Sequence, residues 1–170
     1  ISYFRSSMEL DPNDRRAPSL SLIVAEFFYE RDQYKDAIRY YNMHFSRLSD
    51  YQKDLSDYKT AWCYIGLVDY AKATDKLLSV ILKKEKSKFR QDALKDLAFI
   101  LTEHKPENEI IALGQGRIQD LETRAEFFLL ALESYYAQAK MDNVTQLFTE
   151  VLKIQKTSLE RLKTRFYKME

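Results

Sequence analysis

The ten residues DQYKDAIRYY at positions 32–41 have a counterpart in VDYAKATDKL at positions 68–77. The alignment places Ala37 over Ala73, and a tyrosine three positions earlier over another tyrosine, at a separation of 36 residues. A period of about 20–50 residues is typical of proteins built from stacked structural repeats. We therefore expect repeated units along the chain.

The same step continues through the rest of the chain, reaching Pro106 and then Met141. Within each unit, apolar residues recur every three or four positions on both sides of a short polar break, as two amphipathic helices require. The sequence predicts four repeats at residues 19–50, 51–86, 87–119 and 120–154. The expected helix pairs cover residues 19–32 with 34–48, 51–67 with 70–83, 87–103 with 106–113, and 121–139 with 142–154.

The two ends of the chain are predicted to belong to incomplete repeats. Residues 1–13 resemble the end of a preceding second helix, and residues 155–170 the first helix of another unit. We therefore expect residues 1–170 to form one array that is a piece of a longer protein. Asp50 and Asp142 are the residue type that caps a following helix.

The composition favours a folded, all-α protein. Hydrophobic residues make up 45% and aromatic residues 14% of the 170, which argues against disorder. Gly and Pro total only three each, too few for the turns of a protein rich in hairpins. Lys and Arg number 27 against 26 Asp and Glu, so no strong positive field exists to bind nucleic acid. No apolar run approaches the roughly 20 residues that a membrane-spanning helix needs, and we expect no membrane insertion in this segment.

The repeat resembles the tetratricopeptide repeat (TPR) family over essentially the whole chain, in both helices of the first two units. The third unit departs from the family pattern, because Glu109 stands where a small packing residue is expected and Gly114 and Gly116 are predicted to end its second helix. The step of 35–36 residues also resembles the repeats of bacterial cell-envelope proteins such as the barrel-assembly lipoprotein and the periplasmic partner of the Tol-Pal system. The residues that carry the TPR resemblance are Ala25, Phe28, Ala37 and Tyr41, and then Ala61, Tyr64, Ala73 and Leu77.

The resemblance implies a right-handed superhelical stack of antiparallel helix pairs, in which the first helices line a concave groove that binds peptides. It also implies a location in the bacterial cell envelope or periplasm, although the sequence by itself leaves the compartment open. Tyr58, Trp62 and Ile65 lie four and three residues apart, a spacing that places them on one face of a helix. We expect this aromatic surface to bind an apolar peptide or helix. The candidate groove residues are Tyr29, Tyr58, Lys59, Trp62, Ile65, Lys95 and Tyr136.

No arrangement of residues predicts catalysis, a metal or a cofactor. The nucleotide, serine-hydrolase and zinc-protease motifs are absent, and Cys63, His44 and His104 lack plausible partners. The sequence therefore predicts a non-enzymatic scaffold for protein interactions. A structural subunit that self-associates through open repeat ends, as a homo-oligomer, is the alternative. A third class is a small-molecule sensor or enzyme domain. Basic clusters at residues 83–90 and 153–170 are solvated surface or a site for an acidic partner.

Overall fold

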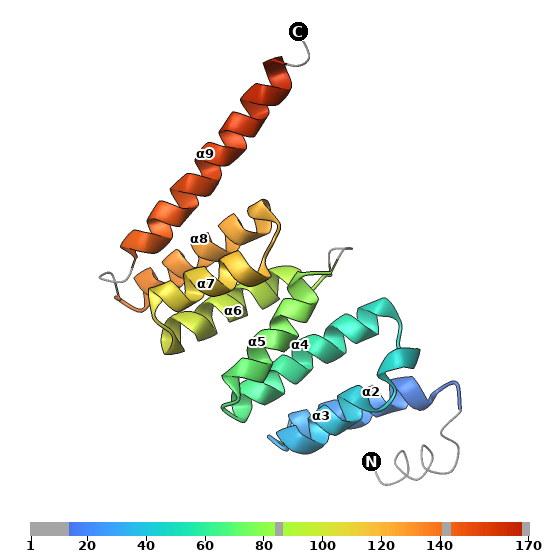
Figure 1. Ribbon diagram of the computed structural model, residues 1–170. Helices are drawn as coiled ribbons and strands as arrows, with labels where there is room; N and C mark the ends of the chain where they lie inside the picture. The colour runs from blue at the N-terminus through green and yellow to red at the C-terminus, as the bar shows by residue number, and fades with distance from the viewer. Residues whose placement is uncertain (1–13, 84–86, 141–143, 168–170) are drawn as a thin grey trace. The chain divides into compact units, whose positions relative to one another are not determined.

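The computed structural model describes residues 14–83, 87–140 and 144–167, with side chains described as far as residue 157. Within these ranges every regular element is a helix and no strand occurs, so the predicted all-α class is confirmed. Figure 1 shows the succession of helices along the chain. Residues 1–13, predicted to end a preceding repeat, lie outside the described residues.

The chain divides into two compact units, and the boundary along the sequence falls within one helix, between Ala93 and Leu94. In the first unit, two helix pairs follow one another, joined by a short 3-10 helix (Figure 1). Its elements are α2 (Ala17–Tyr29), α3 (Tyr34–Met43), η1 (Phe45–Arg47), α4 (Asp50–Gly66) and α5 (Tyr70–Ile81). The remaining helices are α6 (Arg90–His104), which contains the boundary, α7 (Glu107–Arg117), α8 (Leu121–Ala137) and α9 (Thr145–Tyr167).

The turn that ends the first helix of a pair recurs in the backbone. Asp32, Val68 and Ala139 all have a positive φ, of 55°, 61° and 56°. In each case the next residue donates its N–H to the carbonyl five residues earlier, as in the Schellman motif that closes helix ends. Asp32 and Val68 are 36 residues apart, so the sequence period is also a backbone period in the first unit.

Small residues allow the helices of the first unit to pack closely. Ala25, Ala37, Ala61 and Ala73 are all fully buried at the positions where the repeat pattern places a small residue. A larger side chain at any of them would separate the helices, because protein interiors are close-packed. The small residues of the repeat pattern therefore lie on the faces by which the helices of the first unit contact one another.

Several predicted helix ends differ from the structure. Ser49, not Asp50, caps α4, because its hydroxyl accepts from the N–H of Gln52 while the Gln52 side chain accepts from the Ser49 N–H. The helix predicted to reach residue 48 ends at Met43, before η1. Asp142 lies outside the described residues.

Two breaks predicted in the second unit are not present. Helix α7 runs through Gly114 and Gly116 to Arg117, because neither glycine has a positive φ that would end a helix. Helix α9 is continuous from Thr145 to Tyr167, so the expected break near residue 155 is also wrong. Gly114 instead is buried beneath Phe128, where it permits close packing.

Candidate binding surface

Helices α2 and α4 lie side by side in the first unit. Gln52 Nε2 donates to Ser19 Oγ at 3.5 Å, and Lys59 Nζ donates to Glu26 Oε2 at 3.1 Å. Both links join residues that are 33 positions apart, and they lie seven residues, or about two helical turns, from each other. The two first helices are therefore parallel neighbours that present a common surface.

A polar network occupies the centre of this surface. The Tyr41 hydroxyl donates to Glu26 Oε1 at 2.6 Å, and Lys59 donates to the other carboxylate oxygen. Lys59 Nζ also lies 4.5 Å from the centre of the Tyr29 ring. Burial, assisted by the hydrogen bond to Glu26, raises the pKa of Tyr41 far above its ordinary value. Lys59 thus balances the charge of the carboxylate while the neutral Tyr41 hydroxyl adds a second hydrogen bond, and the surface carries little net charge at this point.

Large apolar side chains are exposed on both sides of the network. Trp62 follows Lys59 by three residues and keeps 37% of its surface exposed. Ile23 precedes Glu26 by three residues and is 51% exposed. Residues three apart are neighbours on a helix surface. The α2–α4 surface, defined by Ile23, Glu26, Tyr29, Lys59 and Trp62, therefore combines apolar anchors with a neutralised centre.

Of the other predicted residues on α4, Tyr58 is held within the unit by aromatic packing. Its ring stacks on Phe89, with centres 5.5 Å apart and planes 19° apart, and Tyr51 contacts the same Phe89 ring at 5.5 Å. Ile65 is half-buried. The structure thus brings Tyr29 and Lys59 into contact, whereas one face of the Tyr58 ring is covered by Phe89.

The last two predicted residues belong to the second unit. Lys95 is exposed on α6, and Tyr136 is 73% exposed on α8. These helices are joined by a neutral polar cluster in which Thr102 and Ser134 hydroxyls lie 2.7 Å apart and Gln138 donates to both. Near them on the same two helices, Leu94 and Leu101 are core residues, whereas Leu129 is exposed.

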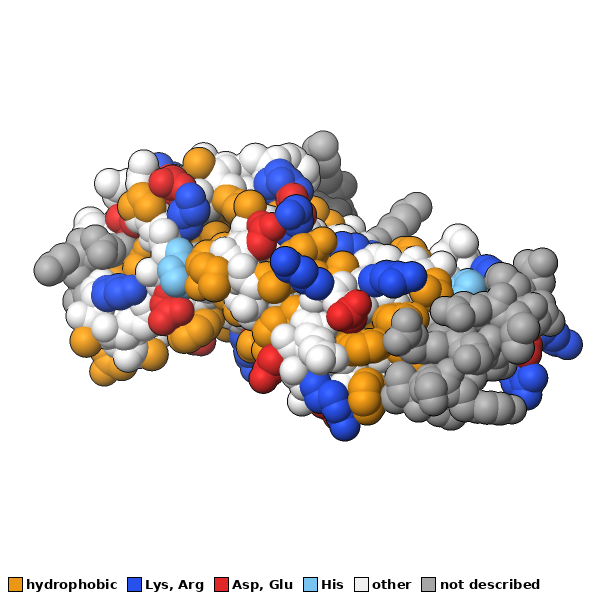
Figure 2. Space-filling model, turned by 90° about the horizontal axis from the view of Figure 1, so that it is seen from below, with side chains coloured by type: hydrophobic (Ala, Val, Ile, Leu, Met, Phe, Trp, Pro, Cys, Tyr) orange, Lys and Arg blue, Asp and Glu red, His pale blue; other side chains and the backbone are white. Residues whose placement is uncertain are grey.

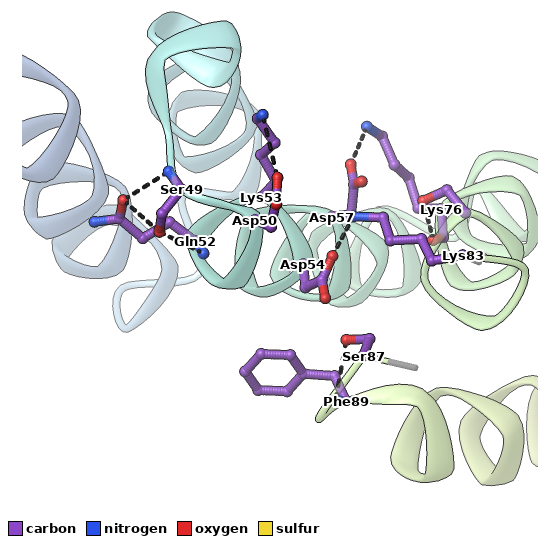
Figure 3. A network of polar contacts seen from close by, with 11 residues as sticks. Ser49, Asp50, Gln52, Lys53, Asp54, Asp57, Lys76, Lys83, Ser87 and Phe89 are labelled. Atoms are coloured by element: carbon purple, nitrogen blue, oxygen red, sulfur yellow. Dashed lines mark hydrogen bonds and ion pairs between the residues drawn. The ribbon is translucent and has the colours of Figure 1, made fainter. Parts of the chain in front are cut away.

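Ion pairs fix α4 to α5 beside this surface (Figure 3). Lys76 Nζ lies 2.8 Å from Asp57, and Lys83 pairs with Asp54; both aspartates are buried. Removing one partner of such a pair would leave a buried charge uncompensated. Lys83 is therefore engaged within the unit, which weakens the case for the basic turn at residues 83–90 as a partner site.

Burial shifts the pKa of two groups considered for catalysis, Cys63 and His44. Burial raises the pKa of the Cys63 thiol to about 12, so it is not a nucleophile near neutral pH. Burial also lowers the pKa of His44. Across the described ranges, no group of three or more His, Cys, Asp or Glu side chains is placed to hold a metal ion.

Comparison with known proteins does not assign the chain to a family. No protein-family model matches it, and no curated protein matches it.

Within the described part of the chain, no helix has both the length and the hydropathy to cross a membrane. Charged side chains of both signs alternate with hydrophobic ones on the face seen in Figure 2, in keeping with the net charge of +1.

Proposed function

We propose that this protein is a non-enzymatic scaffold of TPR type whose α2–α4 surface binds an apolar peptide or helix of a partner protein. The helix pairs would belong to a right-handed superhelical stack of about four repeats. The observation that carries the proposal is the exposure of Trp62 beside the neutralised Glu26–Lys59 pair. Exposed aromatic residues are common anchors of protein interfaces.

The α2–α4 surface can be covered by an apolar segment without a large desolvation penalty. Glu26 already accepts from Tyr41 and Lys59, so covering it does not strand a free charge. Trp62 and Ile23 gain from burial, at about 25 cal/mol per Å² of apolar area removed from water. An apolar segment therefore fits this surface better than a strongly charged one.

The test uses the single tryptophan as both probe and target. Partners are recovered by cross-linking and affinity purification from the native cell, and the affinity of each is then measured with wild type and Trp62→Ala. We expect at least a tenfold loss, about 1.4 kcal/mol, in a domain that remains folded. Leu82→Ala is the matched control, because Leu82 is a similarly exposed apolar residue outside the α2–α4 surface. Equal affinity in wild type and Trp62→Ala would contradict the proposal.

The same preparation separates the scaffold from the self-associating subunit. Light scattering at increasing protein concentration gives the mass of the particle. A concentration-dependent oligomer that Trp62→Ala leaves intact, with no partner recovered, would favour the structural role. We further propose the bacterial cell envelope as the compartment, on the resemblance of the repeat spacing alone, and fractionation of the native cell tests it.

A further inference from the structure

Helix α9 carries two apolar stripes on different sides. The inner stripe is Leu147, Val151 and Ile154, all buried where α9 packs on α7 and α8. Beside it, Phe148 is 56% exposed and Leu152 is 49% exposed. The first part of α9 thus has an apolar face that the described part of its own unit leaves open to solvent.

Two polar contacts fix which side of α9 faces outward. Glu107 accepts from the Leu147 N–H at 2.6 Å, at the first turn of α9. One turn further, Gln115 donates to Glu150 at 2.9 Å. Because both contacts come from α7, the helix is held against α7 and its Phe148–Leu152 side is a defined outer surface.

The sequence of α9 continues the outer stripe and ends the inner one. Positions 147, 151 and 154 are followed in the same register by Ser158, Arg161 and Arg165. Positions 148 and 152 are followed in their register by Gln155, Leu159, Leu162 and Phe166. The outer series has alternating steps of four and three residues, which is the a and d pattern of a coiled coil.

The charges that flank this pattern exclude some partners. In a coiled coil the e and g positions set the choice of partner, and here they include Lys156, Lys163 and Arg165 but no acidic residue. Residues 153–167 contain five basic residues and one acidic residue, in a chain whose net charge is only +1. A second copy of α9 would place like charges opposite one another, whereas an acidic helix would place opposite charges there.

We propose that the outer face of α9 docks an acidic amphipathic helix of another protein as a two-stranded coiled coil. The narrow a and d stripe favours a partner helix over a membrane surface, since membrane-surface helices bury a broader apolar face. This site is separate from the α2–α4 surface, so each proposal stands or fails on its own.

The probe is a synthetic peptide of three heptads with Leu at a and d and Glu at e and g. Glu–Glu repulsion keeps it largely unfolded alone, so docking is seen as a gain of helical circular dichroism and of fluorescence anisotropy. A matched peptide carries Lys at e and g. With the full chain, we expect the Glu peptide to bind at least tenfold more tightly than the Lys peptide and to weaken as salt is added.

Three variants of the chain locate the site. Leu152→Ser should weaken the Glu peptide at least tenfold, with thermal unfolding followed as a check on folding. Lys156→Gln, at an e position, should weaken it about threefold, whereas Lys153→Gln, at an outward b position, should not. The lysine pair decides the matter if Leu152→Ser does not fold.

Three results would overturn the proposal. The first is equal binding of the two peptides, or binding of neither. The second is binding of the chain to anionic vesicles in place of the peptide, with loss in Leu152→Ser, which would make the face a membrane surface. The third is a dimer that Leu152→Ser dissociates, which would make the occupant a second copy.

Discussion

The first and second units achieve close helix packing with small residues at different positions. In the first unit, Ala37 and Ala73 are fully buried 36 residues apart. The next step of 36 reaches Glu109, which is exposed, while Gly114 on the same helix lies against Phe128. Close approach of two helices needs a small residue at the contact, but the contact can move along the helix. The small residue of α7 therefore lies at its contact with α8, and not at the position that the repeat pattern assigns.

The largest expected effect tests whether positions 37 and 73, in the first unit, differ from position 109 in the second. Ala37→Leu and Ala73→Leu should each destabilise the protein by about 3 kcal/mol, because both sites are fully buried and overpacking separates the helices. Glu109→Leu, at the corresponding position of the third pair, should change stability by less than about 0.5 kcal/mol. Urea unfolding followed by circular dichroism measures all three. Similar losses for the three variants would remove the difference between the units.

A second prediction concerns Gly114, the small residue where α7 contacts α8. A Cβ at position 114 would lie 2.4 Å from the ring of Phe128, which is fully buried, so the ring or the helix would have to shift. Gly114→Ala should therefore destabilise by about 2 kcal/mol, although alanine favours helix. Gly116→Ala is the matched control on α7, since nothing lies within 4 Å of its Cβ. We expect Gly116→Ala to raise stability by up to about 1 kcal/mol in the same unfolding assay.

A third prediction compares the polar links of the two units. Tyr41→Phe removes a hydrogen bond to the charged Glu26 and should cost about 2 kcal/mol. Ser134→Ala removes a neutral contact, and Thr102 keeps Gln138 as a partner, so its cost should be about 1 kcal/mol or less. Thermal unfolding of both variants checks the order. A larger loss for Ser134→Ala would show that the charged network of the first unit adds little.

The sequence predicted the all-α class and the helix pairs of the first unit better than the binding surface. The two helix pairs of the first unit were predictable because apolar residues recur with a helical period and because Ala37 and Ala73 mark real contacts. The continuity of α7 was missed because Gly114 reads as a helix end, and only the neighbouring Phe128 shows why glycine is needed there.

The candidate site was predictable only in part. Trp62, singled out from its spacing on the helix, keeps part of its surface exposed on α4. The link between Glu26 and Lys59 depends on an offset of 33 residues between α2 and α4, which differs from the sequence period of 36. Packing sets how far neighbouring helices are shifted along their axes, and the period of the sequence repeat does not predict that shift. Phe89 over Tyr58 is a contact of the same kind.

The smallest expected effect concerns the recurring turns, which are alike in backbone but not in residue type. Val68 has a φ of 61° and is 68% exposed, so a β-branched residue sits in the left-handed region without making core contacts. That conformation costs an L-residue roughly 1–2 kcal/mol, and glycine avoids the cost but adds freedom to the unfolded chain. Val68→Gly should therefore stabilise the protein by about 1 kcal/mol, measured as a rise in melting temperature of roughly 2–4 °C.

The same substitution at the other two turns tests whether backbone strain causes the gain in stability. Ala139→Gly, at a φ of 56°, should stabilise less, because alanine lacks the branched Cβ that makes valine unfavourable there. Asp32→Gly should give no gain, since aspartate tolerates this region and its carboxylate accepts from the Tyr34 hydroxyl at 2.6 Å. If backbone strain governs the three turns, the gain falls in the order Val68, Ala139, Asp32. A loss of stability in Val68→Gly would mean that the exposed valine makes a contact worth more than the strain it bears.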